Sequence, residues 1–203
     1  MRDLILLVPD KNTEYACRGA LGRRHSLGIR DVDFDIDVES GRDGGVRKRG
    51  VQVLKTQQQR FRHALLILDY EGCGAAVSAE ELEAALDASL AEAWGTRAKA
   101  IVIKPEVDVW MWGAETHLKE VLAWKSNLGV RDWLRDRGFT FGPEGKANRP
   151  KEALEAAFRH VHLPRSSAQY ETLAKRLSLA KCKDPAFMRL RASLAGWFPP
   201  ATV

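Results

Sequence analysis

The chain has 203 residues, of which 45% are apolar and 29% charged, and its formal net charge at neutral pH is +5. This is globular composition, which argues against a disordered chain, and the length predicts one domain that buries about 70% of its unfolded surface. No apolar run approaches the roughly 18 residues of a membrane helix, no signal-peptide cleavage site is present, and three widely spaced cysteines fit a reducing cytoplasm better than a disulfide framework.

The first part of the chain predicts alternating strands and helices. Leu4–Val8 is a continuous apolar run, typical of a strand buried on both faces. Thr13 can cap a helix that runs from about Glu14 to Arg24. Val32–Val38 alternates apolar and acidic residues, which predicts a half-buried strand toward an edge of the sheet.

The next segments continue this alternation. Gly41–Gly50 is rich in glycine and basic residues and is expected to be a loop, followed by a helix over Val51–Arg62. Ala64–Leu68 predicts a second central strand, and Ser78 can cap the helix that follows it. Ala100–Ile103 predicts a third buried strand, adjacent and parallel to the other two apolar strands.

The fold class predicted from this order is α/β, with a mostly parallel sheet covered by helices on both faces and a helical C-terminal extension. We expect residues 1–142 to form the core and residues 143–203 a basic extension packed on it. The extension holds 11 basic and 5 acidic residues, whereas the core holds 21 and 22. A basic extension on a near-neutral body suggests a polyanionic partner, and a solvated helical face explains the same charges equally well.

Acidic residues follow three of the expected strands, at the edge where parallel sheets form their sites. Asp69 and Glu71, two positions apart in an extended segment, point the same way. Two neighbouring carboxylates repel each other unless a cation joins them, and Mg²⁺ takes such ligands together with water and phosphate oxygens. These residues therefore indicate metal-assisted phosphoryl transfer, although acids at these positions can also simply cap helices and loops. The charged residues after the three strands are Asp10, Glu14, Asp69, Glu71, Lys104, Glu106 and Asp108.

The order of several short motifs resembles the Toprim superfamily, in particular small bacterial proteins related to the overcoming-lysogenisation-defect nucleases. Asp10-Lys11-Asn12-Thr13-Glu14 resembles the family motif E-G-x-T-E after the first strand, with Asp and Lys in place of Glu and Gly. Leu68-Asp69-Tyr70-Glu71-Gly72 resembles the later Asp-x-Asp motif, with Glu71 as its second acid. Similar segments are Pro105–Trp110, Arg149–Leu154 and Asp184–Phe187.

The resemblance implies Mg²⁺- or Mn²⁺-dependent cleavage of a nucleic-acid phosphodiester, in bacterial defence against phage or plasmids and with an SMC/ABC-type ATPase partner. It implies catalytic roles for Asp10, Glu14 and Lys104, and metal binding by Glu14, Asp69, Glu71, Glu106 and Asp108. The departures at Asp10, Lys11 and Glu71 favour an alternative, a non-catalytic Toprim-like subunit that binds a partner protein or nucleic acid.

Two groups of basic residues are candidates for contacts with nucleic acid. The first lies in the expected glycine-rich loop, and the second lies in the basic extension. Both groups can equally be solvated surface charges. Their members are Arg47, Lys48 and Arg49, and Lys175, Arg176, Lys181 and Lys183.

Overall fold

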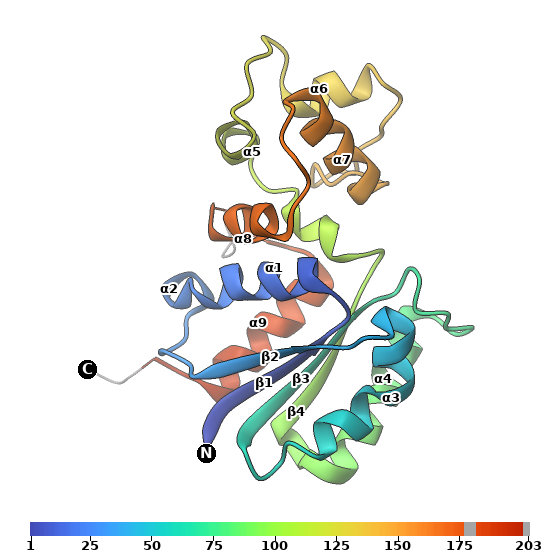
Figure 1. Ribbon diagram of the computed structural model, residues 1–203, viewed down its shortest axis with the longest axis vertical. Coiled ribbons are helices and arrows are strands. Elements are labelled where there is room, and N and C mark those ends of the chain that lie inside the picture. Colours follow the sequence, from blue (N-terminus) through green and yellow to red (C-terminus); the bar gives the residue numbers. More distant parts are fainter. Residues whose placement is uncertain (177–181, 201–203) are drawn as a thin grey trace.

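The computed structural model describes residues 1–176 and 182–200, and within them four parallel strands form one sheet in the order β2-β1-β3-β4 (Figure 1). Every pairing in the sheet is parallel, so the predicted fold class is confirmed. The strands are β1 (Arg2–Val8), β2 (Phe34–Val38), β3 (Phe61–Asp69) and β4 (Ala98–Ile103).

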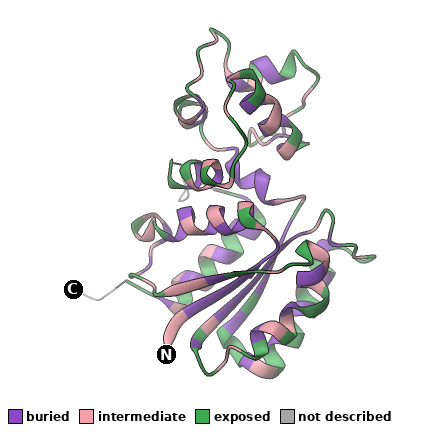
Figure 2. Ribbon diagram, viewed as in Figure 1, coloured by how far each residue is buried: buried purple, intermediate pink, exposed green. Residues whose placement is uncertain are grey.

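Helices cover both faces of the sheet and divide the core into two layers. Alternate residues of β1 point to opposite faces, so that Leu4 and Leu6 belong to one buried cluster while Ile5 and Leu7 belong to the other. This two-sided burial explains the continuous apolar runs of the sequence, and Figure 2 shows β1, β3 and β4 as largely buried, whereas β2 is more exposed. One face packs against α1 (Lys11–Leu21) and α9 (Pro185–Trp197), the other against α3 (Arg42–Lys55) and α4 (Ala79–Trp94).

The remaining helices follow β4, apart from α2 (Arg24–Leu27). In Figure 1, α5, α6 and α7 form a group beyond the sheet, and α8 lies between that group and α1. A β-carbon on Gly19 of α1 would lie 2.7 Å from the Ala174 Cβ atom of α8, so glycine permits this close packing. These helices are α5 (Glu115–Val121), α6 (Val130–Arg135), α7 (Pro150–His160) and α8 (Ser167–Arg176), with short 3₁₀ turns at Gly95–Arg97 and Val107–Met111.

The glycine-rich segment Gly41–Gly50 is not a loop, as the sequence had suggested, but the first part of α3. A β-carbon on Gly50 would lie 2.4 Å from the Leu66 Cδ1 atom, so its glycine lets α3 approach the sheet closely. The expected helix over Val51–Arg62 is wrong at its end, because α3 stops at Lys55 and β3 begins at Phe61. Tertiary packing thus overrides the low helix propensity of glycine here.

Two further expectations need correction. Asp10, rather than Thr13, caps α1, which begins three residues earlier than expected. The strand over Ala100–Ile103 pairs with β3 as expected, but it lies at an edge of the sheet instead of the centre. The expected edge position of β2 and the Ser78 cap of α4 are confirmed.

The outer edge of β4 is covered by side chains of α4. The Ala100 N–H donates to Asp87 Oδ1 and the Val102 N–H donates to Glu83 Oε2, each over 2.7 Å. Four residues of helix rise about 6 Å and two residues of strand about 6.6 Å, so acids one helical turn apart match alternate amides of the strand.

The expected boundary after residue 142 lies within a small turn, where Phe141 and Ala147 form an antiparallel bridge. The division of the chain at that point stays a prediction. None of the helices formed by residues 1–176 and 182–200 is long and apolar enough to cross a membrane.

Candidate functional site

A pocket of about 530 Å³ opens at the carboxyl ends of the strands. Segments that follow all four strands line it, together with the start of α7 and the segment before α8. Its charged lining residues are Asp10, Asp43, Asp69, Glu71, Glu106, Asp108 and Glu152, with Arg42, Lys151 and Arg165 as the cations. We call this cavity the acidic pocket, because carboxylates outnumber cations in its lining.

Asp69, the last residue of β3, is a buried carboxylate of the pocket, with 8% of the residue exposed. Its Oδ1 atom accepts a hydrogen bond from the Val107 N–H (2.8 Å), and its own N–H donates to Asp43 Oδ1 (2.7 Å). Burial, followed by the neighbouring carboxylates Asp43 and Asp10, holds the pKa of Asp69 well above its usual range.

Asp43, in the first turn of α3, is a member of the pocket that the sequence analysis missed. Burial raises its pKa. A signal for it was present, because Asp43 follows a strand as the other candidate acids do. The glycine-rich composition of the segment predicts a loop, and this conceals the signal.

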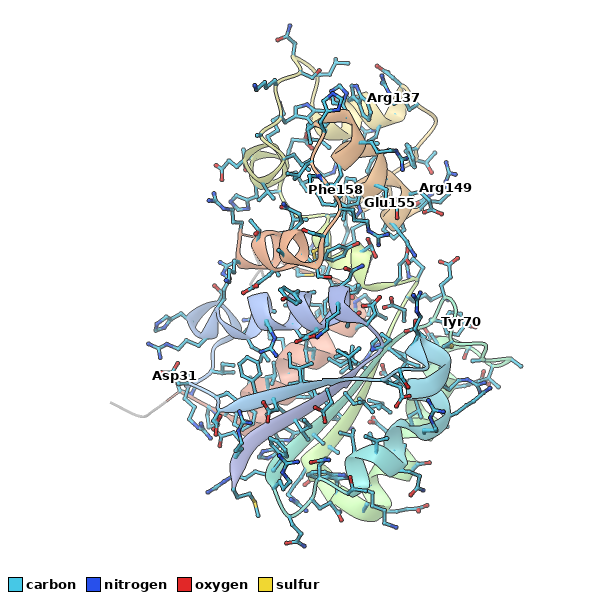
Figure 3. All side chains as sticks on the ribbon, in the orientation of Figure 1. Asp31, Tyr70, Arg137, Arg149, Glu155 and Phe158 are labelled. Carbon is cyan, nitrogen blue, oxygen red and sulfur yellow. The ribbon has the colours of Figure 1, made fainter. Side chains whose placement is uncertain are left out.

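The C-terminal part of the chain orients Asp108. The buried Tyr170 hydroxyl on α8 donates to Asp108 Oδ1 over 2.7 Å, and Arg165 Nη2 donates to the same hydroxyl over 2.9 Å. Arg165 also pairs with Glu155 of α7, which is labelled in Figure 3. Burial raises the pKa of Asp108. Residues distant in sequence thus fix one carboxylate of the pocket.

Glu106 lies near an acidic and a basic side chain of the pocket, those of Asp108 and Lys151. Burial and the nearby Asp108 raise the pKa of Glu106 to about 7, while Lys151 opposes this shift from 3.7 Å. Glu71 lies at the exposed rim of the pocket. Asp10 lines the pocket and is also the cap of α1, where its Oδ1 atom accepts from the Thr13 N–H over 2.8 Å.

Two of the expected site residues lie elsewhere. Glu14 does not line the acidic pocket, because its carboxylate pairs with Lys11 (2.6 Å) and Arg18 (2.9 Å) along α1. Burial opposes ionisation of Glu14, but the two cations outweigh burial and lower its pKa. Lys104 lies 5.8 Å from the centre of the Tyr70 ring and lines a separate cavity of about 160 Å³.

The acidic pocket has other cations in place of Lys104, namely Arg42, Lys151 and Arg165. Lys151 lies in the segment Arg149–Leu154, whose family resemblance implies no role for this residue. Arg165 and Arg42 carry no motif, and only the folded chain brings them to the strand ends.

The donor set suits a hard cation, although it does not form a complete cage. Among the residues that the structure describes, no group of three or more His, Cys, Asp or Glu side chains is arranged to hold a metal ion, so the expected convergence of Glu14, Asp69 and Glu71 is not found. Mg²⁺ commonly uses only one or two carboxylates and fills its other positions with water and phosphate oxygens. Asp69 and Asp43, which the hydrogen bond from the Asp69 N–H joins, are carboxylates of the type used in that mode of binding.

The residues expected to contact nucleic acid do not form one loop, and most of them have protein partners. Arg47 donates to the Cys73 carbonyl (2.8 Å), Arg49 pairs with Glu39, and Lys48 is exposed, all on α3 instead of a loop. Lys175 and Arg176 pair with Glu171 (2.6 Å) and Glu120 (3.2 Å), while Lys183 is exposed and Lys181 lies outside the described residues. Their contact with nucleic acid stays a prediction.

Comparison of the chain with protein-family models, with curated proteins and with solved structures finds no match.

Proposed function

We propose that the protein cleaves nucleic-acid phosphodiesters with the help of Mg²⁺ or Mn²⁺ held in the acidic pocket. The observation that carries this proposal is the burial of Asp69 among the carboxylates of four strand ends. Burying several carboxylates together costs free energy that packing alone does not return, and a divalent cation offsets that cost.

Asp69 would hold the ion together with one of the carboxylates that face it, Asp43 or Asp10. Glu71, Glu106 and Asp108 interact with one another or lie in the same lining, and they would supply the ligands of a second ion. When bound, the ions would polarise the phosphate and lower the pKa of an attacking water.

The residues of the chain itself would position the substrate and balance its charge. Lys151 and Arg165 lie in the same pocket as the carboxylates, where they can bind the non-bridging oxygens of a phosphate. Tyr170 holds Asp108 in one orientation, so this carboxylate enters the reaction without reorganising. Asp10 is held by its capping bonds in the same way and is the candidate acid or base of the first motif.

The biological setting follows from the Toprim resemblance alone. On that resemblance, we propose a role in the bacterial cytoplasm, in defence against phage or plasmids and with an SMC/ABC-type ATPase partner. A partner that hydrolyses ATP agrees with the sequence, which contains no P-loop motif of its own.

One observation favours the alternative, a non-catalytic Toprim-like subunit that binds a partner or nucleic acid. Glu14 is committed to Lys11 and Arg18, and the part of the chain that the structure describes shows no three-ligand metal site. A chain that kept the fold but lost catalysis would have these features.

A thermal melt with and without Mn²⁺, combined with a nuclease assay, tests the proposal. We expect millimolar Mn²⁺ to stabilise the wild type by about 2–3 kcal/mol if its concentration is near one hundred times the Kd, and Asp69→Asn to remove both this shift and cleavage. Asp132→Asn is the matched control, because this exposed aspartate pairs with Arg135 outside the pocket. A wild type that neither responds to Mn²⁺ nor cleaves nucleic acid would favour the non-catalytic subunit.

A further inference from the structure

A second cavity, of about 490 Å³, adjoins the acidic pocket. The two cavities share lining residues from the ends of β1 and β2 and from the α7 and α8 region, so they form one continuous depression. The shared residues are Asp10, Asn12, Arg42, Lys151 and Arg165. The second cavity contains four cationic side chains, Lys11, Arg42, Lys151 and Arg165, and we call it the basic bay.

The charge of the basic bay is opposite to that of the acidic pocket. Its four cations face only two carboxylates in the lining, those of Asp10 and Glu39. The cations come from the starts of α1, α3 and α7 and from the segment before α8, so the fold gathers them from four distant parts of the sequence. Gathering like charges is unfavourable unless acidic side chains or a bound anion compensate them.

Three of the four cations already have acidic partners. Lys11 pairs with Glu14 (2.6 Å), Lys151 lies 3.7 Å from Glu106, and Arg165 pairs with Glu155.

Arg42 differs from the other three cations. Within residues 1–176 and 182–200 its side chain makes neither a hydrogen bond nor an ion pair, and it is exposed at the mouth of the bay. Its backbone φ of 51° lies in the left-handed region, which an arginine adopts only at a cost. The guanidinium of Arg42 is therefore available to bind an anion at this cavity.

We propose that the basic bay binds a second phosphate of the nucleic-acid strand, next to the phosphodiester held in the acidic pocket. Arg42 supplies a planar guanidinium that can bind two phosphate oxygens at once, while Lys11 contributes a point charge. This inference rests on the proposed function, because it assigns a further contact to the same substrate. The ligand is either an internal phosphate or a 5′-terminal phosphate, since both present the same oxygens.

Fluorescence anisotropy with a labelled single-stranded oligonucleotide, in EDTA to prevent cleavage, tests the bay directly. We expect Arg42→Gln to weaken binding about tenfold and to lower the slope of log affinity against log salt by about one, as loss of one phosphate contact predicts. Arg42→Lys keeps the charge and should retain the salt slope. Arg159→Gln removes an exposed charge at the far end of α7 and should bind within about twofold of the wild type.

Arg42→Gly separates binding from folding. Glycine suits the left-handed backbone at this position, so we expect this variant to melt no lower than the wild type and yet to bind as weakly as Arg42→Gln. Weakened binding of 5′-hydroxyl and 5′-phosphate oligonucleotides alike would support the bay and assign an internal phosphate. Weakening confined to the 5′-phosphorylated oligonucleotide would support the bay and assign the terminal phosphate. Unchanged binding by both Arg42 variants, or an equal loss in Arg159→Gln, would overturn the inference.

The binding measurement can fail independently of the proposed cleavage. If the wild type cleaves with Mn²⁺ but Arg42→Gln binds normally, the nuclease proposal stands and the basic bay is rejected. If Arg42→Gln loses affinity but the wild type cleaves nothing, the bay stands and the chain binds nucleic acid without cutting it.

Discussion

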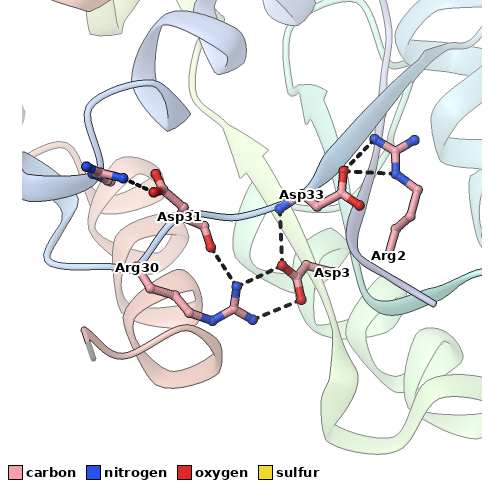
Figure 4. Close-up of polar contacts among 6 residues, drawn as sticks. Arg2, Asp3, Arg30, Asp31 and Asp33 are labelled. Carbon is pink, nitrogen blue, oxygen red and sulfur yellow. Dashed lines mark hydrogen bonds and ion pairs between the residues drawn. The ribbon is translucent and has the colours of Figure 1, made fainter. Parts of the chain in front are cut away.

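The two ends of the parallel sheet treat their aspartates in opposite ways. At the amino-terminal end, Arg30 donates to both oxygens of Asp3, over 2.8 and 2.9 Å, and Arg2 pairs with Asp33 (Figure 4). Hydrogen bonds from Arg30 lower the pKa of Asp3 to about 2. At the carboxyl end, the pKa of Asp69 is raised instead, because Asp69 is buried and other carboxylates lie near it. At one end of the sheet an arginine stabilises the charged form of the aspartate, whereas at the other end burial and neighbouring carboxylates destabilise it.

The largest effect is expected from Asp69→Asn in the absence of divalent ions. A raised pKa in the folded state means that the folded protein keeps a proton that the unfolded chain releases, so Asp69 makes stability fall as the pH rises above about 4. Asparagine keeps the acceptor for Val107 without this cost, and we expect the free energy of unfolding at pH 8 in EDTA to rise by about 2 kcal/mol. Urea denaturation at pH 5 and pH 8 measures the gain, which should be smaller at pH 5. A loss of stability at pH 8 would mean that the carboxylates of the pocket do not repel one another.

Arg30→Ala tests the opposite end. It leaves the Asp3 carboxylate without its main partner and removes the guanidinium that lies 5.1 Å from the centre of the Phe198 ring. We expect a loss of about 1.5 kcal/mol, modest because the arginine side chain is 40% exposed. Chemical denaturation checks this value, and Arg30→Lys should recover part of the loss. If Arg30→Ala is as stable as the wild type, the ion pair contributes nothing to folding.

The pH dependence of the amino-terminal end has the opposite sign. A lowered pKa of Asp3 in the folded state adds stability that is complete above about pH 4 and is lost as the pH falls toward 2. We expect Asp3→Asn to reduce the fall in unfolding free energy between pH 4 and pH 2 by about 1 kcal/mol, after allowance for solvent screening. Denaturation curves across this range measure the fall, and parallel profiles for the two proteins would contradict the assignment.

The smallest effect is expected from Glu14→Gln, which tests whether a residue that matches the family motif but does not line the acidic pocket contributes to metal binding. Loss of the pairs with Lys11 and Arg18 should cost about 0.5 kcal/mol and leave the response to Mn²⁺ unchanged. Thermal melts with and without Mn²⁺ measure both quantities. If the Mn²⁺ shift disappears in this variant, Glu14 turns toward the metal when the ion binds.

The sequence predicts the sheet better than it predicts the site. Continuous apolar runs such as Leu4–Val8 identify strands because two-sided burial leaves no other pattern. Strand-end reasoning found Asp69 and Asp108, which lie next to such runs. It could not find Tyr170 or Arg165, because their place in the pocket depends on how α8 packs against α1, a contact between segments about 150 residues apart.

The helix α3 shows a different limit. Its glycines lower helix propensity and predict a loop, but Gly50 is present because the sheet approaches the helix too closely for a side chain. Misreading that segment also concealed Asp43 and assigned Arg47 to a flexible loop. Helix propensity depends on each residue and its near neighbours, so it cannot predict that a helix will pack closely on a sheet.

The carboxylates that cover β4 have a consequence for how the protein can associate. A free strand edge offers amide groups to which a second polypeptide can add a strand, a common route to both assembly and aggregation. Here Glu83 and Asp87 already occupy the outward amides of Ala100 and Val102, and Glu83 is in turn held by Arg189 of α9 over 2.5 Å. Another chain cannot extend the sheet on this side without first displacing both acids, so any protein that joins the molecule at β4 has to dock on α4 and α9 rather than on the strand.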